Sequence, residues 1–285
     1  MNGGLFMAVI QLGNIKMSAA QDKLPSDLDL LISMDSSRLT EVVSGDCGGK
    51  SLLEYINTHD GCLGTKGKGL KKFPFVVKVL SNPIPGLVQV NAYPNQDSLW
   101  YVLEAREGAA IGYGFKEGVT KEQITDGIVN NTLAQDLNVI PVKAGEVLKV
   151  EAGTVFALCN GLTILDIQNE LINDAPTKEI VELLKIEPVT HDHHMGEWLA
   201  DGEAKYGCLG KVASFDADLY DLHGRLDMDA DSESFKVLVF TEGTAVIESG
   251  DEILHAQQYS TFFVGADTKP FPITGHCQFV MIRMA

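Results

Sequence analysis

The chain has 285 residues, of which 45% are hydrophobic, and its formal net charge at pH 7 is −17. This length can hold two domains of ordinary size. The negative charge argues against nucleic acid and anionic membranes as partners, because both require clustered lysine and arginine side chains. No stretch reaches the roughly 18 uncharged apolar residues that a membrane span needs. Five scattered cysteines without a CxxC pair favour reduced thiols in a cytoplasmic protein.

Short apolar runs recur along the chain with Gly, Pro, Asn and Asp between them, and this spacing predicts a mainly all-β fold. The first expected strands cover residues 73–80, 86–92, 99–105, 109–115, 139–150, 154–159 and 162–168, and a second set runs from residue 236 to the end. Three helices are expected at 51–58, 120–133 and 177–186. Thr120 and Gln123 have the spacing of a capping box at the start of the second helix.

The third helix and Pro188, which follows it, predict a domain boundary after residue 188. We expect an N-terminal domain over 1–188 with inserted helices and a smaller C-terminal domain over 189–285. The strand and turn pattern of KVLVFTEGTAVIESGDEILHAQQYSTFFVGA resembles a shortened repeat of LWYVLEAREGAAIGYG joined to IPVKAGEVLKVEAGTVFAL. Such weak internal repetition indicates two jelly-roll barrels with a few short helices.

Four stretches make the sequence similar to a known family. They are GKSLLEYI with the following CLG, FPFVVKVL, WYVLEA with IGYG, and NVIPVKAGEVLKVEAGTVFALCNGLTILDIQ. In order and spacing they resemble the type I mannose-6-phosphate isomerases (phosphomannose isomerases) over about residues 30–168, and the C-terminal part resembles them more loosely. The resemblance implies a double-cupin fold. It also implies carbohydrate metabolism, through a zinc-dependent isomerase that interconverts mannose 6-phosphate and fructose 6-phosphate.

The resemblance also implies a metal site at Gln89, Asn91, Ser98 and Phe156, but only Gln89 keeps the family's residue. The family has histidine at the positions of Asn91 and Phe156, and glutamate at that of Ser98. Amide and hydroxyl groups add no charge and are poor replacements for imidazole and carboxylate on zinc. Asp97 lies next to Ser98, but on a strand it points to the opposite face. The sequence therefore predicts a degenerate zinc site and no bound cofactor.

The residues at which the family binds its substrate are also partly replaced. By the resemblance, Lys78, Gln89 and Trp100 are the remaining candidate substrate-binding residues, while a second family lysine is replaced by Gln96. Each has a structural alternative: Lys78 can extend its ammonium to the barrel mouth, Gln89 can be a satisfied core amide, and Trp100 can be an ordinary core residue. Asp166 stands where the family has glutamate. It can keep a hydrogen bond without any metal.

One other cluster could carry chemistry. The segment THDHHMGEW puts His191, His193, His194 and Glu197 within seven residues. On a helix these side chains would have metal-binding spacing, which makes them a candidate secondary metal site. A solvated or adventitious cluster is the alternative, and a pH response is a third, because imidazoles titrate near neutrality.

The sequence leaves three functions open. We favour a non-catalytic relative that serves as a binding or regulatory module for a sugar or sugar phosphate. The second is an active aldose–ketose isomerase with a rebuilt metal site, and the third is a structural protein without a ligand. The catalytic residues stay unassigned. A homodimer is compatible with each function.

Overall fold

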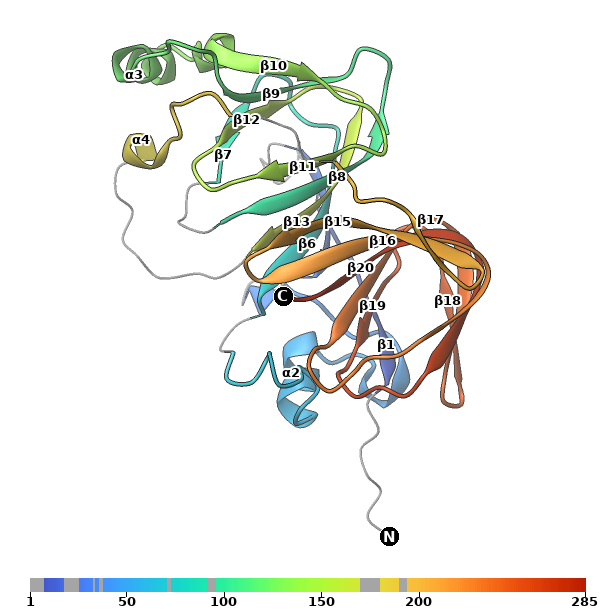
Figure 1. Ribbon diagram of the computed structural model, residues 1–285. Helices are drawn as coiled ribbons and strands as arrows, with labels where there is room; N and C mark the ends of the chain where they lie inside the picture. Colours follow the sequence, from blue (N-terminus) through green and yellow to red (C-terminus); the bar gives the residue numbers. More distant parts are fainter. Residues whose placement is uncertain are drawn as a thin grey trace. The chain divides into compact units, whose positions relative to one another are not determined.

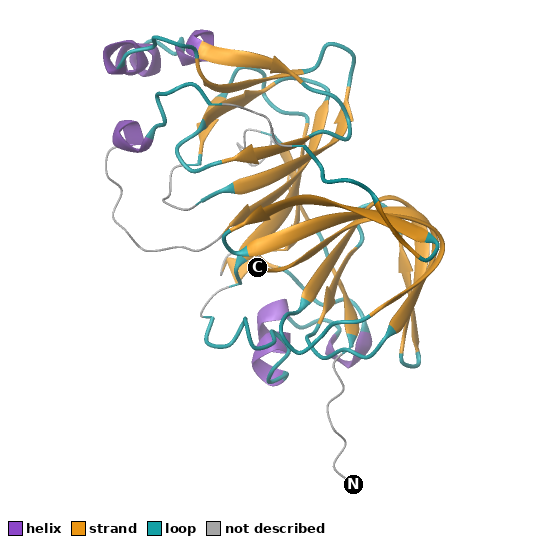
Figure 2. Ribbon diagram, viewed as in Figure 1, coloured by secondary structure: helices purple, strands orange, loops and turns teal. Residues whose placement is uncertain are grey.

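The computed structural model describes residues 8–17, 26–32, 34–35, 38–70, 73–91, 96–169, 180–189 and 194–285. Strands dominate these residues, and the helices are short (Figure 2). The predicted all-β fold class is confirmed. No helix in the described ranges is long and apolar enough to cross a membrane.

The chain divides into two compact units. The central unit comprises residues 16–29 and 77–194, and the C-terminal unit comprises residues 1–15, 30–76 and 195–285. The division falls inside three strands, β2 (Ile15–Met17), β3 (Asp27–Ile32) and β6 (Phe75–Ser81). Each unit has its own buried apolar clusters.

The central unit is built from two sheets. One has the order β10-β9-β12-β7 and the other the order β11-β8-β13-β6-β3-β2, and Figure 1 shows the strands of the two sheets as separate layers. Residues of both sheets, among them Trp100, Ile111, Phe156 and Ile164, form one buried cluster. This is the two-layer arrangement of a jelly roll.

The strands of the central unit not yet given are β7 (Val88–Val90), β8 (Ser98–Ala105), β9 (Ala110–Phe115), β10 (Leu137–Pro141), β11 (Val147–Val150), β12 (Val155–Leu158) and β13 (Leu162–Asn169). Its helices are α3 (Lys121–Val129) and α4 (Ile180–Leu183), with a 3-10 turn at Leu133–Asp136.

The C-terminal unit contains an eight-stranded sheet with the order β1-β19-β17-β20-β16-β15-β14, and β18 pairs with β17. Its strands are β1 (Val9–Leu12), β14 (Leu199–Asp201), β15 (Ala204–Val212), β16 (Phe215–Met228), β17 (Lys236–Ser249), β18 (Glu252–Ala256), β19 (Thr261–Val264) and β20 (Phe271–Met284). The unit also holds the hairpin β4 (Met34–Asp35) and β5 (Arg38–Leu39), a 3-10 turn at Gly45–Cys47, and helix α2 (Leu52–Thr58).

These units differ from the predicted division at 188/189. The predicted boundary lies close to residue 194, where the central unit ends, but residues 1–15 and 30–76 belong to the C-terminal unit. The cause is long-range pairing: β1 is antiparallel to β19, with Val9 opposite Val264, and Ala266 N donates to Cys62 O at 2.8 Å. Local sequence patterns do not reveal such partners.

Two predicted strand assignments need correction. The strand expected over 139–150 is two strands, β10 and β11, because the backbone turns at Gly145, whose φ of 87° suits glycine. Conversely, KVLVFTEG and TAVIESG form a single strand, β17, with an irregularity in its pairing to β20 between Phe240 and Glu242. The bulge absorbs the predicted turn without ending the strand.

The helix starts follow their capping residues. Helix α2 begins after Ser51, which forms a capping box with Glu54, and α3 begins after Thr120, which forms the predicted one with Gln123. Helix α3 ends earlier than expected, where Asn131 adopts a φ of 55° and Thr132 N donates to Gly127 O at 2.8 Å. In the predicted third helix, residues 177–179 lie outside the described residues and α4 covers only Ile180–Leu183.

We expect Thr120→Ala to lower the free energy of unfolding by about 1 kcal/mol, the usual cost of losing a threonine N-cap. The substitution removes the acceptor for Gln123 N, now 3.3 Å from the Thr120 hydroxyl. Urea unfolding measures the loss. Thr125→Ala, within the same helix, is the matched control and is expected to be neutral or stabilising because alanine favours the helix interior. Equal losses in the two variants would contradict a capping role.

Candidate functional site

A cavity of about 290 Å³ lies in the central unit and gathers six of the residues singled out from the sequence: Lys78, Gln89, Asn91, Gln96, Phe156 and Asp166. It is lined by Ser26, Leu28, Lys78, Leu80, Gln89, Val90, Asn91, Gln96, Phe156, Asp166 and Gln168. They come from β3, β6, β7, β12, β13 and the segments next to them.

Strand pairing brings the four family metal positions together. In the antiparallel pair β7–β12, Phe156 stands directly opposite Gln89. Asn91 follows β7, Ser98 begins β8, and Asn91 Nδ2 donates to Ser98 Oγ at 3.1 Å. Positions 89, 91, 98 and 156 therefore converge, as the resemblance implies.

The side chains at these positions do not fit zinc. Asn91 uses its Nδ2 to donate to Ser98 and to Val150 O, and its Oδ1 accepts from Gln168 Nε2 at 3.3 Å. The Phe156 ring packs edge-to-face on Trp100, with ring centroids 4.8 Å apart, and offers no donor atom. Zinc sites need several imidazole, thiolate or carboxylate ligands. Within the described ranges, no group of three His, Cys, Asp or Glu side chains is placed to hold a metal.

Asp97 does not rescue the site. Its Oδ1 accepts a hydrogen bond from Ala152 N at 2.9 Å, and Asp97 is not among the residues that line the cavity. This position agrees with the alternation of side chains along a strand, which turns Asp97 away from the face that Ser98 occupies.

A continuous chain of polar contacts occupies one side of the cavity. Lys78 Nζ lies 3.1 Å from Asp166 Oδ2 and donates to Gln168 Oε1 at 3.2 Å, and Gln168 continues the chain to Asn91 and Ser98. Asp166 and Gln168 are two residues apart on β13 and so face the same way. The second oxygen of Asp166, Oδ1, is buried and has no hydrogen-bond partner among the described residues.

The Lys78–Asp166 pair is asymmetric, since the Lys78 side chain is 21% exposed and that of Asp166 only 4%. We expect Lys78→Met to lower the free energy of unfolding by about 2 kcal/mol, less than the 3–5 kcal/mol typical of fully buried pairs because water still reaches Lys78. The double variant Lys78→Met/Asp166→Leu should recover most of this loss, since no buried charge remains unpaired. Urea unfolding of both variants tests this. A double variant no more stable than the single one would contradict it.

The structure also places the other sequence candidates. Trp100 is 1% exposed and belongs to the core beneath Phe156 rather than to the lining of the cavity. His191 and His193 lie outside the described residues, while His194 and Glu197 are exposed. Sequence reasoning missed Gln168, although its position two residues after Asp166 on one strand was a usable signal.

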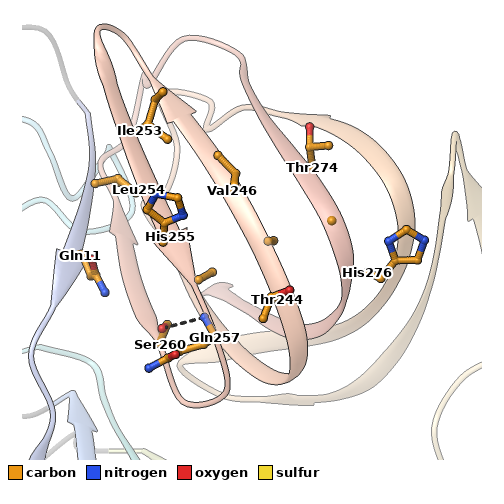
Figure 3. Close-up of a pocket in the computed structure, with 13 residues that line it drawn as sticks. Gln11, Thr244, Val246, Ile253, Leu254, His255, Gln257, Ser260, Thr274 and His276 are labelled. Atoms are coloured by element: carbon orange, nitrogen blue, oxygen red, sulfur yellow. Dashed lines mark hydrogen bonds between the residues drawn. The ribbon is translucent and has the colours of Figure 1, made fainter.

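A second cavity, of about 690 Å³, lies in the C-terminal unit on an exposed face of β17, β18 and β20. Figure 3 shows His255 and His276 on opposite sides of this face, with Val246 and Thr274 between them. The lining includes Gln257, whose backbone N–H donates to Ser260 Oγ at 3.0 Å, and the residues described there include no aspartate, glutamate, lysine or arginine. It lacks the buried charged pair that marks the cavity of the central unit.

Another cavity of the C-terminal unit, of about 440 Å³, is lined by Asp218, whose side chain is 9% exposed. Burial raises the pKa of Asp218, and the Arg283 guanidinium, with Nη2 3.5 Å from Asp218 Oδ2, opposes the rise only in part. Desolvation of the carboxylate therefore outweighs its ion pair.

This raised pKa predicts a pH-dependent stability. The folded state binds the Asp218 proton more tightly than the unfolded state, so the wild type loses stability as the pH rises from 3.8, the ordinary value, through the folded pKa. Asp218→Asn cannot titrate. As the pH rises from 3.8 through the folded pKa, we expect the free energy of unfolding of the variant to increase relative to that of the wild type. The difference should persist at pH 7. Urea unfolding at several pH values measures it, and a difference independent of pH would contradict it.

No protein-family model matches the chain. Three known proteins to which it is similar share one name, mannose-6-phosphate isomerase. The chain is 25% identical to the probable mannose-6-phosphate isomerase GmuF of Bacillus subtilis over 284 residues, covering 88% of the chain and 87% of the relative. It is 33% identical to the mannose-6-phosphate isomerase of Streptococcus mutans over 147 residues, or 48% and 46% of the two chains. The crystal structure of the mannose 6-phosphate isomerase from Bacillus subtilis superposes with a TM-score of 0.80 at 20% identity, over 96% of this chain and 99% of the other.

Proposed function

We propose that this chain, which belongs to the mannose-6-phosphate isomerase family, is a non-catalytic member that binds a small sugar or sugar phosphate in the cavity of the central unit. In the family, zinc polarises the sugar oxygens while a proton moves between C1 and C2. The present side chains are unsuited to hold that ion. The proposal therefore separates ligand binding, for which a cavity exists, from isomerisation.

One observation carries the proposal. Three of the four positions of the family's zinc ligands are engaged in other interactions, since Asn91 bonds to Ser98 and Gln168, and Phe156 packs on Trp100. These contacts engage the polar atoms of Asn91 and Ser98, and Phe156 has no atom that could bind a metal. Lys78, Asp166, Gln89 and Gln168 still line the cavity and offer polar groups to a bound molecule.

Metal content and turnover test the non-catalytic part. We expect purified protein to hold substoichiometric zinc after dialysis and to produce no fructose 6-phosphate from mannose 6-phosphate, with or without added zinc. The isomerase from Streptococcus mutans, measured in the same coupled assay, is the positive control. Stoichiometric zinc together with turnover, both lost in Gln89→Ala, would overturn the proposal and establish an active isomerase with a rebuilt metal site.

A further inference from the structure

We infer that the cavity of the central unit selects a neutral, unphosphorylated polyhydroxylated ligand, such as a free monosaccharide or a sugar alcohol, through the Lys78–Asp166 pair. This inference rests on the proposed function and narrows its ligand class. It departs from the phosphorylated substrate in the names of the relatives.

The first argument for a neutral ligand comes from the charged residues that line the cavity. Lys78 and Asp166 are the only charged residues among the described ones that line it, and Lys78 Nζ lies 3.1 Å from Asp166 Oδ2. The described part of the lining therefore has no net charge. A phosphate dianion is held by cationic groups and by N–H or hydroxyl donors. Here it would have to take Lys78 away from Asp166 and lie beside a buried carboxylate, and both changes are unfavourable.

The hydrogen-bonding groups carry the second step. Asp166 Oδ1 is buried without a partner among the described residues, and a carboxylate oxygen accepts but cannot donate. Because Asp166 lines the cavity, a rotation of its carboxylate would bring this oxygen to a ligand hydroxyl, which would supply the missing donor in a charge-assisted hydrogen bond. The amides of Gln89 and Gln168 also line the cavity and offer both donors and acceptors, as sugar hydroxyls do.

The size and apolar surface carry the third step. The cavity of about 290 Å³ is at the small end of the ~300–1,000 Å³ range of small-molecule sites, which favours one sugar ring over an oligosaccharide. Leu80, Val90 and Phe156 line its apolar part and can contact the C–H groups of a ring.

Titration of the wild-type protein with D-mannose, D-mannitol, mannose 6-phosphate and inorganic phosphate tests the inference directly. Ligand-observed NMR suits weak binding of this kind. We expect D-mannose or D-mannitol to bind with an affinity that changes little with salt. Mannose 6-phosphate should bind at least about tenfold more weakly than the better of the two, equivalent to 1.4 kcal/mol.

The variant Asp166→Asn is expected to reverse this order. Loss of the charged acceptor should weaken binding of the neutral ligand by about tenfold, while the freed Lys78 should strengthen binding of mannose 6-phosphate. Asp221→Asn is the matched control, because Asp221 also pairs with a lysine, Lys205, at 3.1 Å but lies in the C-terminal unit. It should leave both affinities unchanged.

The outcomes separate the two claims. Tighter binding of mannose 6-phosphate than of the neutral sugars by the wild type would overturn the inference and leave the proposed function standing. Unchanged neutral-ligand binding in folded Asp166→Asn would also overturn it. If none of the four probes binds, the proposed ligand-binding function and the inference fail together. Turnover of mannose 6-phosphate would remove the non-catalytic assignment. If Asp166→Asn does not fold, the wild-type comparison alone decides.

Discussion

The triple variant Asn91→His, Ser98→Glu and Phe156→His is expected to bind one zinc ion per chain, whereas the wild type is expected to bind none stoichiometrically. The expectation follows from the backbone, which already holds the four family positions together. Phe156 stands opposite Gln89 in the β7–β12 pair, and Asn91 Nδ2 reaches Ser98 Oγ at 3.1 Å. Two imidazoles, a carboxylate and the retained amide are a donor set that zinc accepts.

The substitutions carry a stability cost that zinc should offset. Ser98 is fully buried, and Asn91→His breaks hydrogen bonds to Ser98, Gln168 and Val150. Without metal, the triple variant is therefore expected to melt below the wild type. Zinc, which binds only the folded state tightly, should raise its melting temperature by mass action. Metal analysis after dialysis and thermal unfolding with and without zinc measure the two effects.

The double variant that keeps Phe156 is the matched control for this experiment. This variant carries Asn91→His and Ser98→Glu, and the phenyl ring of Phe156 still occupies the place of one ligand. We therefore expect its zinc affinity to be at least about tenfold below that of the triple variant, equivalent to 1.4 kcal/mol. Equal zinc content in the two variants would show that Phe156 does not stand in a ligand position. Absence of zinc from a folded triple variant would show that the backbone no longer presents the family geometry.

The second large effect concerns stability of the C-terminal unit. Phe235→Ala is expected to lower the free energy of unfolding by about 3–5 kcal/mol, the range for a buried phenylalanine. Phe235 is fully buried, and its ring centroid lies 5.0 Å from that of Phe73, 5.9 Å from Phe75 and 5.4 Å from Phe263. Removing the ring takes contacts from three neighbours at once and leaves a cavity that close packing cannot fill.

Ile253→Ala, in the same unit, is the matched control for Phe235→Ala. Ile253 is 65% exposed, so its truncation is expected to change the free energy of unfolding by less than about 0.5 kcal/mol. Urea unfolding of the two variants under identical conditions gives the comparison. A loss below about 1 kcal/mol for Phe235→Ala would show that the aromatic cluster repacks around the missing ring.

Local sequence pattern predicted much of the central unit and little of the segments that join the C-terminal unit. The strands expected at 99–105, 109–115, 154–159 and 162–168 match β8, β9, β12 and β13 closely, because each apolar run ends at a turn residue. The pairing of β1 with β19 could not be predicted in this way, since its residues are about 250 positions apart. Periodicity describes one strand and does not identify its neighbour.

The candidate site was predictable to a similar extent. The resemblance named Lys78, Gln89, Asn91 and Phe156, and the structure brings all four to one cavity. The spacing of Gln168 from Asp166 indicates that both face the same side of β13, but the hydrogen bonds of Gln168 to Lys78 and Asn91 depend on neighbouring segments that one strand does not identify. The predicted role of Trp100 in substrate binding stays a prediction. In the structure the indole packs against Phe156 and is 1% exposed.

The linked side chains of the central cavity also bear on how such a site evolves. Because Asn91 bonds at once to Ser98 and Gln168, and Gln168 to Lys78, a single step back toward a metal ligand disrupts several partners before any ion can compensate. Each intermediate sequence is then less stable than either end point. A chain with this arrangement is separated from one with zinc ligands at the same positions by a barrier that one mutation at a time does not readily cross.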